Sequence, residues 1–411
     1  MTSSGESPSR SEDGILAGIS VVECGEGIAA AFAAKMMADL GANVLKIEAP
    51  GGDRARRRGP FPNDEENPEK SGLFLYLNTN KRGIQLALDR PEGREILARL
   101  LRKADILVHN VAPCERPACG LESDKLARQF PELIIAGISP FGDSGPYKDW
   151  KAYPLNLENA GGMAFLAPGA SQSPELPPLK AFGDQPEYQG GLHACYAALA
   201  AYWSRLGGGE PLTIEISEQE CIAAMLELNF MHYTYAGRET SRLGRRILGP
   251  WLLADCSDGV IFVACAEEAQ WQRMVEVMGD PAWAHEELFK DRLTRGANSD
   301  ALNLFIKEWA SSWKTQELFH AGQGKRVPFA SVNTMKDVYA DAQLNFRDYF
   351  VTLDYPGVGK LRIPGAPARW GSGWSIRSLA PRLGQHNEEV LVGELGMSSA
   401  EFAALRQAGT I

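Results

Sequence analysis

The sequence predicts an α/β protein in which helices cover a parallel sheet, because short apolar segments typical of strands alternate with segments typical of helices. The clearest repeat begins with an apolar segment at 19–23 and the glycine turn Gly25-Glu26-Gly27. An alanine-rich helical segment that ends at Leu40 then leads to a second apolar segment at 43–47. Two strands joined by one helix are expected to be parallel, with a right-handed crossover.

Two further repeats extend this sheet. A helix is predicted at 91–103, where Pro91 opens the first turn, and a strand follows at 106–108. Another helix at 123–130 precedes a strand at 133–138. These repeats predict that a Rossmann-like sheet forms the larger part of the molecule.

The later part of the chain changes in character. A long alanine-rich helix at about 189–206 precedes a strand at 212–216. The segment 245–333 then combines a strand at 260–264 with helices that carry Trp271, Trp283, Trp309 and Trp313. We therefore expect this segment to form a separate small α+β domain.

Composition excludes several classes of protein. The chain has 411 residues and a net charge of −10, so it lacks the positive field that binding to nucleic acid or to an anionic membrane requires. No apolar run approaches the roughly 18 residues that span a bilayer, and the polar first residues have no signal-peptide core. Seven dispersed cysteines without a C-x-x-C pair and six dispersed histidines predict neither a disulfide scaffold nor a metal site. We expect a cytoplasmic protein without a metal.

The glycine turn allows two interpretations. Gly25 and Gly27, with Ala30 three residues later and Glu48 at the end of the next strand, resemble a dinucleotide-binding fingerprint. In that case the turn would hold a pyrophosphate and Glu48 a ribose hydroxyl of NAD. The alternative is an ordinary turn that needs positive φ angles. In both cases the turn and the helix that follows it are a favourable place for a phosphate or another polar ligand.

Four arginines stand close together after the second predicted strand, at positions 54, 56, 57 and 58. Arginine forks bind phosphate bidentately, so the cluster predicts an anion site such as one for nucleotide phosphates. The alternative is a solvated loop whose arginines pair with surface carboxylates.

Two carboxylates, Asp184 and Glu187, precede the glycine pair Gly190-Gly191 at the entrance of the alanine-rich helix. A carboxylate at this place often only caps the helix. The functional alternative is a carboxylate nucleophile with glycine N–H groups nearby to stabilise an oxyanion.

Longer motifs occur in order over most of the chain. They are Gly18–Glu23, Met37–Asp53, Leu77–Ile84, Ala104–Asn110, Gly137–Gly142 with Gly145-Pro146, Leu383–Asn387 and Gly409–Ile411. This series resembles family III CoA-transferases, the CaiB/BaiF family that includes formyl-CoA and carnitine CoA-transferases, with α-methylacyl-CoA racemases as relatives. The resemblance implies a cytoplasmic enzyme that uses CoA esters, without NAD or a metal, and an interlocked homodimer.

The predicted strand–helix repeats and the family-like C-terminal tail flank a compositionally distinct segment, so we expect both ends of the chain to build one large domain. In chain order we expect a disordered leader (1–14), the N-terminal part of a large Rossmann-like CoA-binding domain (15–225), a linker (226–244), the small α+β domain (245–333), and a linker with the C-terminal part of the large domain (334–411).

The mechanism that the resemblance implies uses a carboxylate nucleophile. In the family an aspartate four residues before a helix-opening glycine attacks the acyl-CoA thioester, and CoA is then carried on the enzyme as a thioester. Glu187 stands at this position, four residues before Gly191, and Asp184 is the reserve candidate. Contacts to CoA are implied for a set of eight residues: Ile28, Ala29, Arg56, Arg57, Lys81, Asn110, Lys151 and Tyr153.

Three other functions stay open at this point. A CoA-ester racemase or isomerase would need a general acid–base pair, but Tyr153-Pro154 replaces the racemases' His-Asp dipeptide. A catalytically silent CoA-binding paralogue is favoured by Glu187 in place of aspartate. It is also favoured by Leu243–Gly249, which replaces the glycine-rich loop of formyl-CoA transferases. An NAD-dependent oxidoreductase depends on the glycine turn and Glu48 alone.

Overall fold

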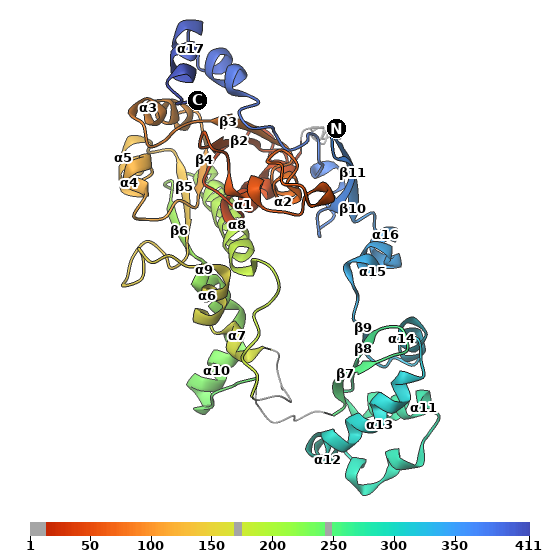
Figure 1. The fold of residues 1–411 in the computed structure, drawn as a ribbon. Coiled ribbons are helices and arrows are strands. Elements are labelled where there is room, and N and C mark those ends of the chain that lie inside the picture. Colours follow the sequence, from red (N-terminus) through yellow and green to blue (C-terminus); the bar gives the residue numbers. More distant parts are fainter. Residues whose placement is uncertain (1–13, 168–174, 243–248) are drawn as a thin grey trace, which may run out of the picture. The chain divides into compact units, whose positions relative to one another are not determined.

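The computed structural model describes residues 14–167, 175–242 and 249–411 (Figure 1). Residues 1–13 of the expected leader and residues 243–248 of the segment that replaces the glycine-rich loop lie outside the described residues. The described residues form two compact units. Of the described residues, the first takes 14–167, 178–240 and 349–411, and the second takes 175–177, 241–242 and 249–348.

A six-stranded parallel sheet forms the centre of the first unit, which confirms the predicted α/β class. Its strands are β1 (Ser20–Cys24), β2 (Asn43–Glu48), β3 (Lys81–Gln85), β4 (Ile106–His109), β5 (Ile134–Ser139) and β6 (Thr213–Ser217). Their order is β3-β2-β1-β4-β5-β6, which is typical of doubly wound α/β folds. The connections after β1 and after β4 leave in opposite directions, so the sheet has a switch point between these two strands.

Helices cover both faces of this sheet, as the alternation of side chains along each strand requires (Figure 1). Val21 of β1 belongs to a core with α1 (Ala29–Asp39) and α8 (Gln185–Leu206). The next residue, Val22, belongs to a second core with α3 (Pro91–Leu101) and α5 (Ser123–Gln129). Strands buried on both sides explain why these segments are continuously apolar.

The C-terminal segment completes the second core and covers the sheet edge. Val390, Leu391 and Ile411 pack with the residues of α3 and α5. The edge strand β3 donates its N–H groups at Gly83 and Gln85 to His386 Nδ1, at 3.0 Å, and Asn387 Oδ1, at 2.8 Å. The turn around His386 and Asn387 therefore supplies hydrogen-bond partners to N–H groups of the edge strand that another strand could otherwise pair with. The elements that follow are the π-helical turn η7 (Glu389–Glu394) and α17 (Ser399–Gln407).

The second unit has its own antiparallel sheet and its own core, in which Trp271, Phe289 and Phe329 are buried. The sheet has the order β7-β8-β9, with β7 (Trp251–Asp255), β8 (Val260–Ala264) and β9 (Phe329–Ser331). Its helices are α11 (Glu268–Val277), α12 (Arg292–Ala297), α13 (Ser299–Ser311), α14 (Thr315–Gly324), α15 (Met335–Ala340) and α16 (Ala342–Phe346).

Several elements were not predicted from the sequence. They are α2 (Gly72–Leu77), β3, α4 (Arg116–Cys119), α6 (Pro154–Ala160), α7 (Met163–Leu166), α9 (Glu218–Ala223), α10 (Glu227–Ala236) and the hairpin of β10 (Phe350–Tyr355) and β11 (Gly359–Pro364). Helix α10 lies within the segment 226–244 that was expected as a linker. Helix α8 begins at Gln185 rather than near residue 189, so Glu187 belongs to its first turn and not to a loop. No helix in the described part of the chain is long and apolar enough to cross a membrane.

Candidate functional site

A cleft of about 630 Å³ opens at the carboxyl edge of the parallel sheet. Residues directly after all six strands line it: Gly25 after β1, Ala49 after β2, Leu86 after β3, Asn110 after β4, Pro140 after β5 and Glu218 after β6. The crevice at the carboxyl ends of the strands, next to the switch point between β1 and β4, is where open α/β sheets bind their ligands. The fold therefore places the candidate site here.

The glycine turn at the base of the cleft is fixed by the side chain of Asn110. Its Oδ1 accepts the N–H of Glu26 at 3.1 Å, and its Nδ2 donates to the Glu26 carbonyl at 2.7 Å. Gly25 has a φ of 134°, and a Cβ atom there would lie 1.8 Å from Asn110 Oδ1. Only glycine fits this close approach. Asn110 lines the cleft, but its amide is engaged in shaping the turn.

A buried ion network holds the turn from the other side. Asp53 accepts the N–H of Gly27 at 2.8 Å and that of Ala55 at 2.7 Å. Lys46 contacts Asp53 at 2.8 Å and Glu23 at 2.7 Å, with all three side chains fully buried. Burial alone would raise the pKa of Asp53, but the charge of Lys46 and the hydrogen bonds outweigh it and lower that pKa. The network therefore stays charged and ties the glycine turn to the arginine segment.

Glu187 lies in the cleft at the point where helices α1 and α8 begin. Its Oε2 accepts the N–H of Ile28 at 3.2 Å, and its Oε1 lies 3.5 Å from Arg54 Nη2. Ile28 is the residue that caps α1, so the carboxylate faces one of the free N–H groups at a helix N-terminus. Burial raises the pKa of Glu187, and the charge of Asp184 adds to this, whereas Arg54 and the Ile28 N–H oppose it.

The glycine pair after Glu187 allows this meeting of two helices. A Cβ atom at Gly191 would lie 2.6 Å from the Ala29 carbonyl oxygen, so only glycine lets α8 pass this close to α1. A Cβ atom at Gly190 would lie 3.0 Å from Glu218 Cγ. The pair was predicted to supply N–H groups to an oxyanion, but within α8 its role is to provide space.

A second carboxyl group, Glu218, lines the same cleft and was missed by the sequence analysis. It is the first residue of α9 and is buried. Burial raises the pKa of Glu218 to about 8, and the negative charge of Glu187 contributes to this. The available signal was an acidic residue directly after the strand that ends at Ser217, which places it at the carboxyl edge of the sheet.

Four of the predicted site residues line the cleft together: Asn110, Lys151, Tyr153 and Glu187. Lys151 and Tyr153 precede α6 and are exposed, beside Lys148 and Trp150. Ile28 and Ala29 are buried at the start of α1, and Ile28 contributes its N–H. Asp184, the reserve nucleophile, is not among the lining residues and pairs with Arg58 at 2.6 Å.

Arg56, Arg57 and Lys81, which were expected to contact CoA, do not line the cleft. Arg56 is buried, binds both carboxylate oxygens of Glu48 at 2.7 and 2.8 Å, and stacks on Phe74. Lys81 is buried against Glu23 at 2.7 Å. Arg57 is exposed and donates to the Gly51 carbonyl at 3.2 Å. The arginine of this cluster that does line the cleft is Arg54, which the sequence analysis did not select.

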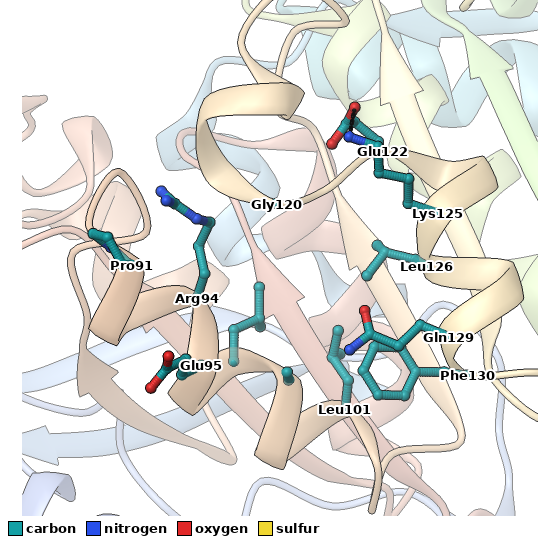
Figure 2. A pocket seen from close by; sticks show the side chains of 12 residues that line it. Pro91, Arg94, Glu95, Leu101, Gly120, Glu122, Lys125, Leu126, Gln129 and Phe130 are labelled. Atoms are coloured by element: carbon teal, nitrogen blue, oxygen red, sulfur yellow. Dashed lines mark ion pairs between the residues drawn. The ribbon is translucent and has the colours of Figure 1, made fainter.

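A smaller cavity of about 400 Å³ lies between helices α3 and α5 (Figure 2). Figure 2 shows Pro91, Arg94 and Glu95 on one side, with Leu126, Gln129 and Phe130 on the other. None of the predicted site residues lines it. The described residues also contain no group of three or more histidine, cysteine, aspartate or glutamate side chains that could hold a metal ion.

Comparison with known proteins identifies the family. The model of CoA-transferase family III matches residues 16–387. The chain belongs to this family. The family III resemblance that the motifs predicted is therefore confirmed.

Relatives of this family III CoA-transferase match it over nearly its full length. The β subunit of succinyl-CoA–L-malate CoA-transferase from Chloroflexus aurantiacus is 30% identical over 95% of this chain and 96% of that protein. Succinate–glutarate CoA-transferase from Agrobacterium fabrum is 28% identical over 92% of this chain and 94% of its own length. The crystal structure of a CaiB/BaiF family protein from Brucella suis is 27% identical and has a TM-score of 0.83, covering 93% of this chain and 99% of that chain.

Proposed function

We propose that this family III CoA-transferase moves CoA from an acyl-CoA thioester to a carboxylate acceptor through covalent intermediates on Glu187. The observation that carries the proposal is the carboxylate of Glu187 in the sheet-edge cleft, held between the Ile28 N–H and Arg54. The name of one relative pairs succinyl-CoA with L-malate, and that of another pairs succinate with glutarate.

The first half of the reaction loads CoA onto the enzyme. A carboxylate oxygen of Glu187 attacks the thioester carbonyl, the C–S bond breaks, and CoA leaves as a thiolate, so that a mixed anhydride forms. The thiolate then attacks the Glu187 carbonyl of this anhydride. The donor carboxylate leaves, and Glu187 carries CoA as a thioester.

The second half transfers CoA to the acceptor. The acceptor carboxylate attacks the Glu187 thioester and expels the CoA thiolate, which forms a second mixed anhydride. The thiolate attacks the acceptor carbonyl of that anhydride, and the products are the new acyl-CoA and the free Glu187 carboxylate. No net proton is taken up or released in either half.

The surroundings of Glu187 suit these steps. The Ile28 N–H orients one oxygen, and the Arg54 guanidinium stabilises negative charge that develops on the reacting groups. Burial separates the carboxylate from bulk water, which would hydrolyse the anhydride and thioester intermediates. The extra methylene of glutamate relative to aspartate lengthens the reach of the nucleophile without changing its chemistry.

The lining residues before α6 support binding of the nucleotide part of CoA. Lys148 and Lys151 bring two positive charges to the rim of the cleft, and Trp150 and Tyr153 bring exposed aromatic rings. Cationic side chains bind phosphates, and aromatic rings stack on bases. We propose these residues, together with Arg54, in place of Arg56, Arg57 and Lys81.

We also propose that the protein acts as a homodimer. Helix α10 has no buried residue in the single chain, and it exposes large apolar side chains, among them Leu228, Phe230, Tyr233 and Tyr235. An apolar helix in water is normally covered by a partner. Sedimentation of the full chain should give a dimer mass, and a monomer at micromolar concentration would contradict this part of the proposal.

Two alternative functions are less well supported. The NAD hypothesis needs the Glu48 carboxylate free to hold a ribose, but Glu48 is buried in its pair with Arg56. The racemase hypothesis needs a catalytic histidine at Tyr153, and no histidine lines the cleft among the described residues. A silent paralogue would bind CoA esters without turnover, which kinetics can distinguish.

The test is transfer activity with a panel of donors and acceptors named in relatives: succinyl-CoA with L-malate or glutarate, and formyl-CoA with oxalate, the pair of a Streptomyces avermitilis relative that is 29% identical to this chain. Glu187→Gln keeps the shape and removes the nucleophile, so it should lower kcat at least about 1,000-fold while binding of CoA changes little. Glu187→Asp should retain part of the activity, and Asp184→Asn is the matched control with a small effect. Normal turnover by Glu187→Gln would exclude Glu187 as the nucleophile, and no turnover by the unaltered chain with any pair would favour the silent paralogue.

A further inference from the structure

The buried carboxyl group of Glu218 is not used in the mechanism above, although it lines the same cleft as Glu187. Glu218 as a whole is only 6% exposed. Among the described residues no hydrogen bond or ion pair reaches its carboxyl group, although buried polar groups are normally paired, and its oxygens are not fully enclosed by protein. An unpartnered buried group that faces a cleft is available to a ligand.

The fold brings Glu218 next to the nucleophile. Strand β6 ends at Ser217, so Glu218 stands at the carboxyl edge of the sheet, and its side chain packs against Gly190 of α8. The Cβ position of Gly190 lies 3.0 Å from Glu218 Cγ and 3.5 Å from Oε1. Gly190 is three residues after Glu187, which places it one turn further along the same side of the helix. Glu218 therefore borders the space in which substrates meet Glu187.

The charge state of Glu218 follows from its surroundings. Burial raises its pKa to about 8, the negative charge of Glu187 on α8 adds to this, and Arg54 opposes it. The elements packed against α9 carry two other carboxylates, both engaged elsewhere. Glu158 on α6 accepts the N–H of Ala181 at 2.8 Å, and Glu215 on β6 accepts that of Asp143 at 3.2 Å. At neutral pH Glu218 therefore keeps its proton, whereas the charge of Arg54 and the Ile28 N–H favour the ionised form of Glu187.

We propose that Glu218 donates a hydrogen bond to the carboxylate of the acceptor and so positions it for attack on the Glu187 thioester. The inference rests on the proposed function and adds a binding residue for the carboxylate substrate. The acceptor oxygen bonds to the Glu187 carbonyl carbon while the C–S bond breaks and the CoA thiolate leaves, and the proton remains on Glu218 throughout. A neutral carboxyl group attracts an incoming carboxylate, whereas an ionised one beside Glu187 would repel it.

The proposal predicts that the pH profile of the transfer rate has an alkaline limb, in which the rate falls as pH rises. Once Glu218 loses its proton, kcat/KM for the acceptor should fall roughly tenfold per pH unit. Glu218→Gln keeps an N–H donor that cannot ionise. It should therefore retain activity at pH 7 within about fivefold and show no limb. Glu218→Leu removes the donor and should raise KM for the acceptor at least tenfold at pH 7.

The experiment compares pH profiles from pH 6 to 9.5 for the unaltered chain, Glu218→Gln and Glu220→Gln, with the donor–acceptor pair of the panel that turns over fastest. Glu220 lies on the same helix, is exposed and does not line the cleft, so Glu220→Gln should keep the limb. A limb that persists in Glu218→Gln, an unaltered chain without a limb, or an unchanged KM in a folded Glu218→Leu would each overturn the role of Glu218. If Glu218→Leu fails to fold, the Glu218→Gln profile decides. Failure of the proposed function appears differently, as the absence of any covalent adduct on Glu187 in the unaltered chain.

Discussion

The charges behind the glycine turn and the charges in the cleft belong to the same compact unit but differ in how they are paired. Behind the turn, Lys46 touches two carboxylates, and Arg56 binds both oxygens of Glu48, with these side chains almost completely buried. In the cleft, Glu187 has one N–H and a longer contact to Arg54, and Glu218 has no partner among the described residues. Paired buried charges maintain the fold, whereas unpaired ones are available for chemistry.

The largest effect on stability is expected from breaking the paired region. Lys46→Met leaves Glu23 and Asp53 buried beside each other without the cation between them. Removing one partner of a buried network typically lowers the free energy of unfolding by about 3–5 kcal/mol. Urea unfolding measures this, with Lys148→Met as a control that should change it by less than about 0.5 kcal/mol. Equal stability of the two variants would contradict the assignment of the network to the fold.

Neighbouring arginines offer a sharper contrast within one segment. Arg56→Ala leaves the buried Glu48 carboxylate unpaired and exposes Phe74, so it should lower the free energy of unfolding by about 2–4 kcal/mol. Arg57→Ala removes an exposed side chain and should have an effect below about 0.5 kcal/mol. Thermal unfolding of both variants measures the difference. A larger loss of stability in Arg57→Ala than in Arg56→Ala would contradict the assignment of Arg56 to the fold.

The buried carboxyl group of Glu218 should lower the stability of the protein at neutral and alkaline pH, but not at acid pH. Its pKa is about 8 in the folded protein and near 4.5 when unfolded, so the folded state binds the extra proton between these values. Stability from this group is therefore complete below about pH 4.5 and is lost as pH rises towards 8. Glu218→Gln should raise the free energy of unfolding by about 3 kcal/mol at pH 7 and by little at pH 4.5. A gain that is the same at both pH values would show that ionisation of Glu218 is not its source.

The smallest effect is expected at the rim of the cleft. Lys151→Ala removes an exposed charge and should weaken CoA binding about three- to tenfold at low salt, and less at high salt because ions screen the attraction. Calorimetry of CoA binding measures both. Arg57→Ala is the matched control and should leave the affinity unchanged at either salt concentration.

The class of fold could be predicted from the sequence because strands that are buried on both faces consist of continuous apolar segments. Strand β3 was missed because Lys81 and Arg82 open it, and their charges conceal a strand whose edge is covered by His386 and Asn387. Glu187 could be selected from its spacing to Gly191 and the family resemblance. Glu218 was missed, because an acidic residue after a strand marks the edge of the sheet, but only the fold shows that it lies beside Gly190 of α8.

The arginine segment shows a different limit of the sequence. Arg54–Arg57 form a 3₁₀-helix, in which residues three apart share a side. Arg54 and Arg57 are therefore on the outer side, and Arg56 points inwards to Glu48. Four arginines in five positions indicated an anion site, but only the local helix decides which of them can reach a ligand.

The central claim is that the Glu187 carboxylate carries CoA during transfer. Its most direct test is intact-protein mass spectrometry after incubation with succinyl-CoA or formyl-CoA alone, followed by borohydride reduction or hydroxylamine cleavage and mapping of the modified peptide. We predict a CoA thioester on the peptide that contains Glu187, and none in Glu187→Gln. An adduct mapped to Asp184 or Glu218, or an adduct that persists in Glu187→Gln, would contradict the account.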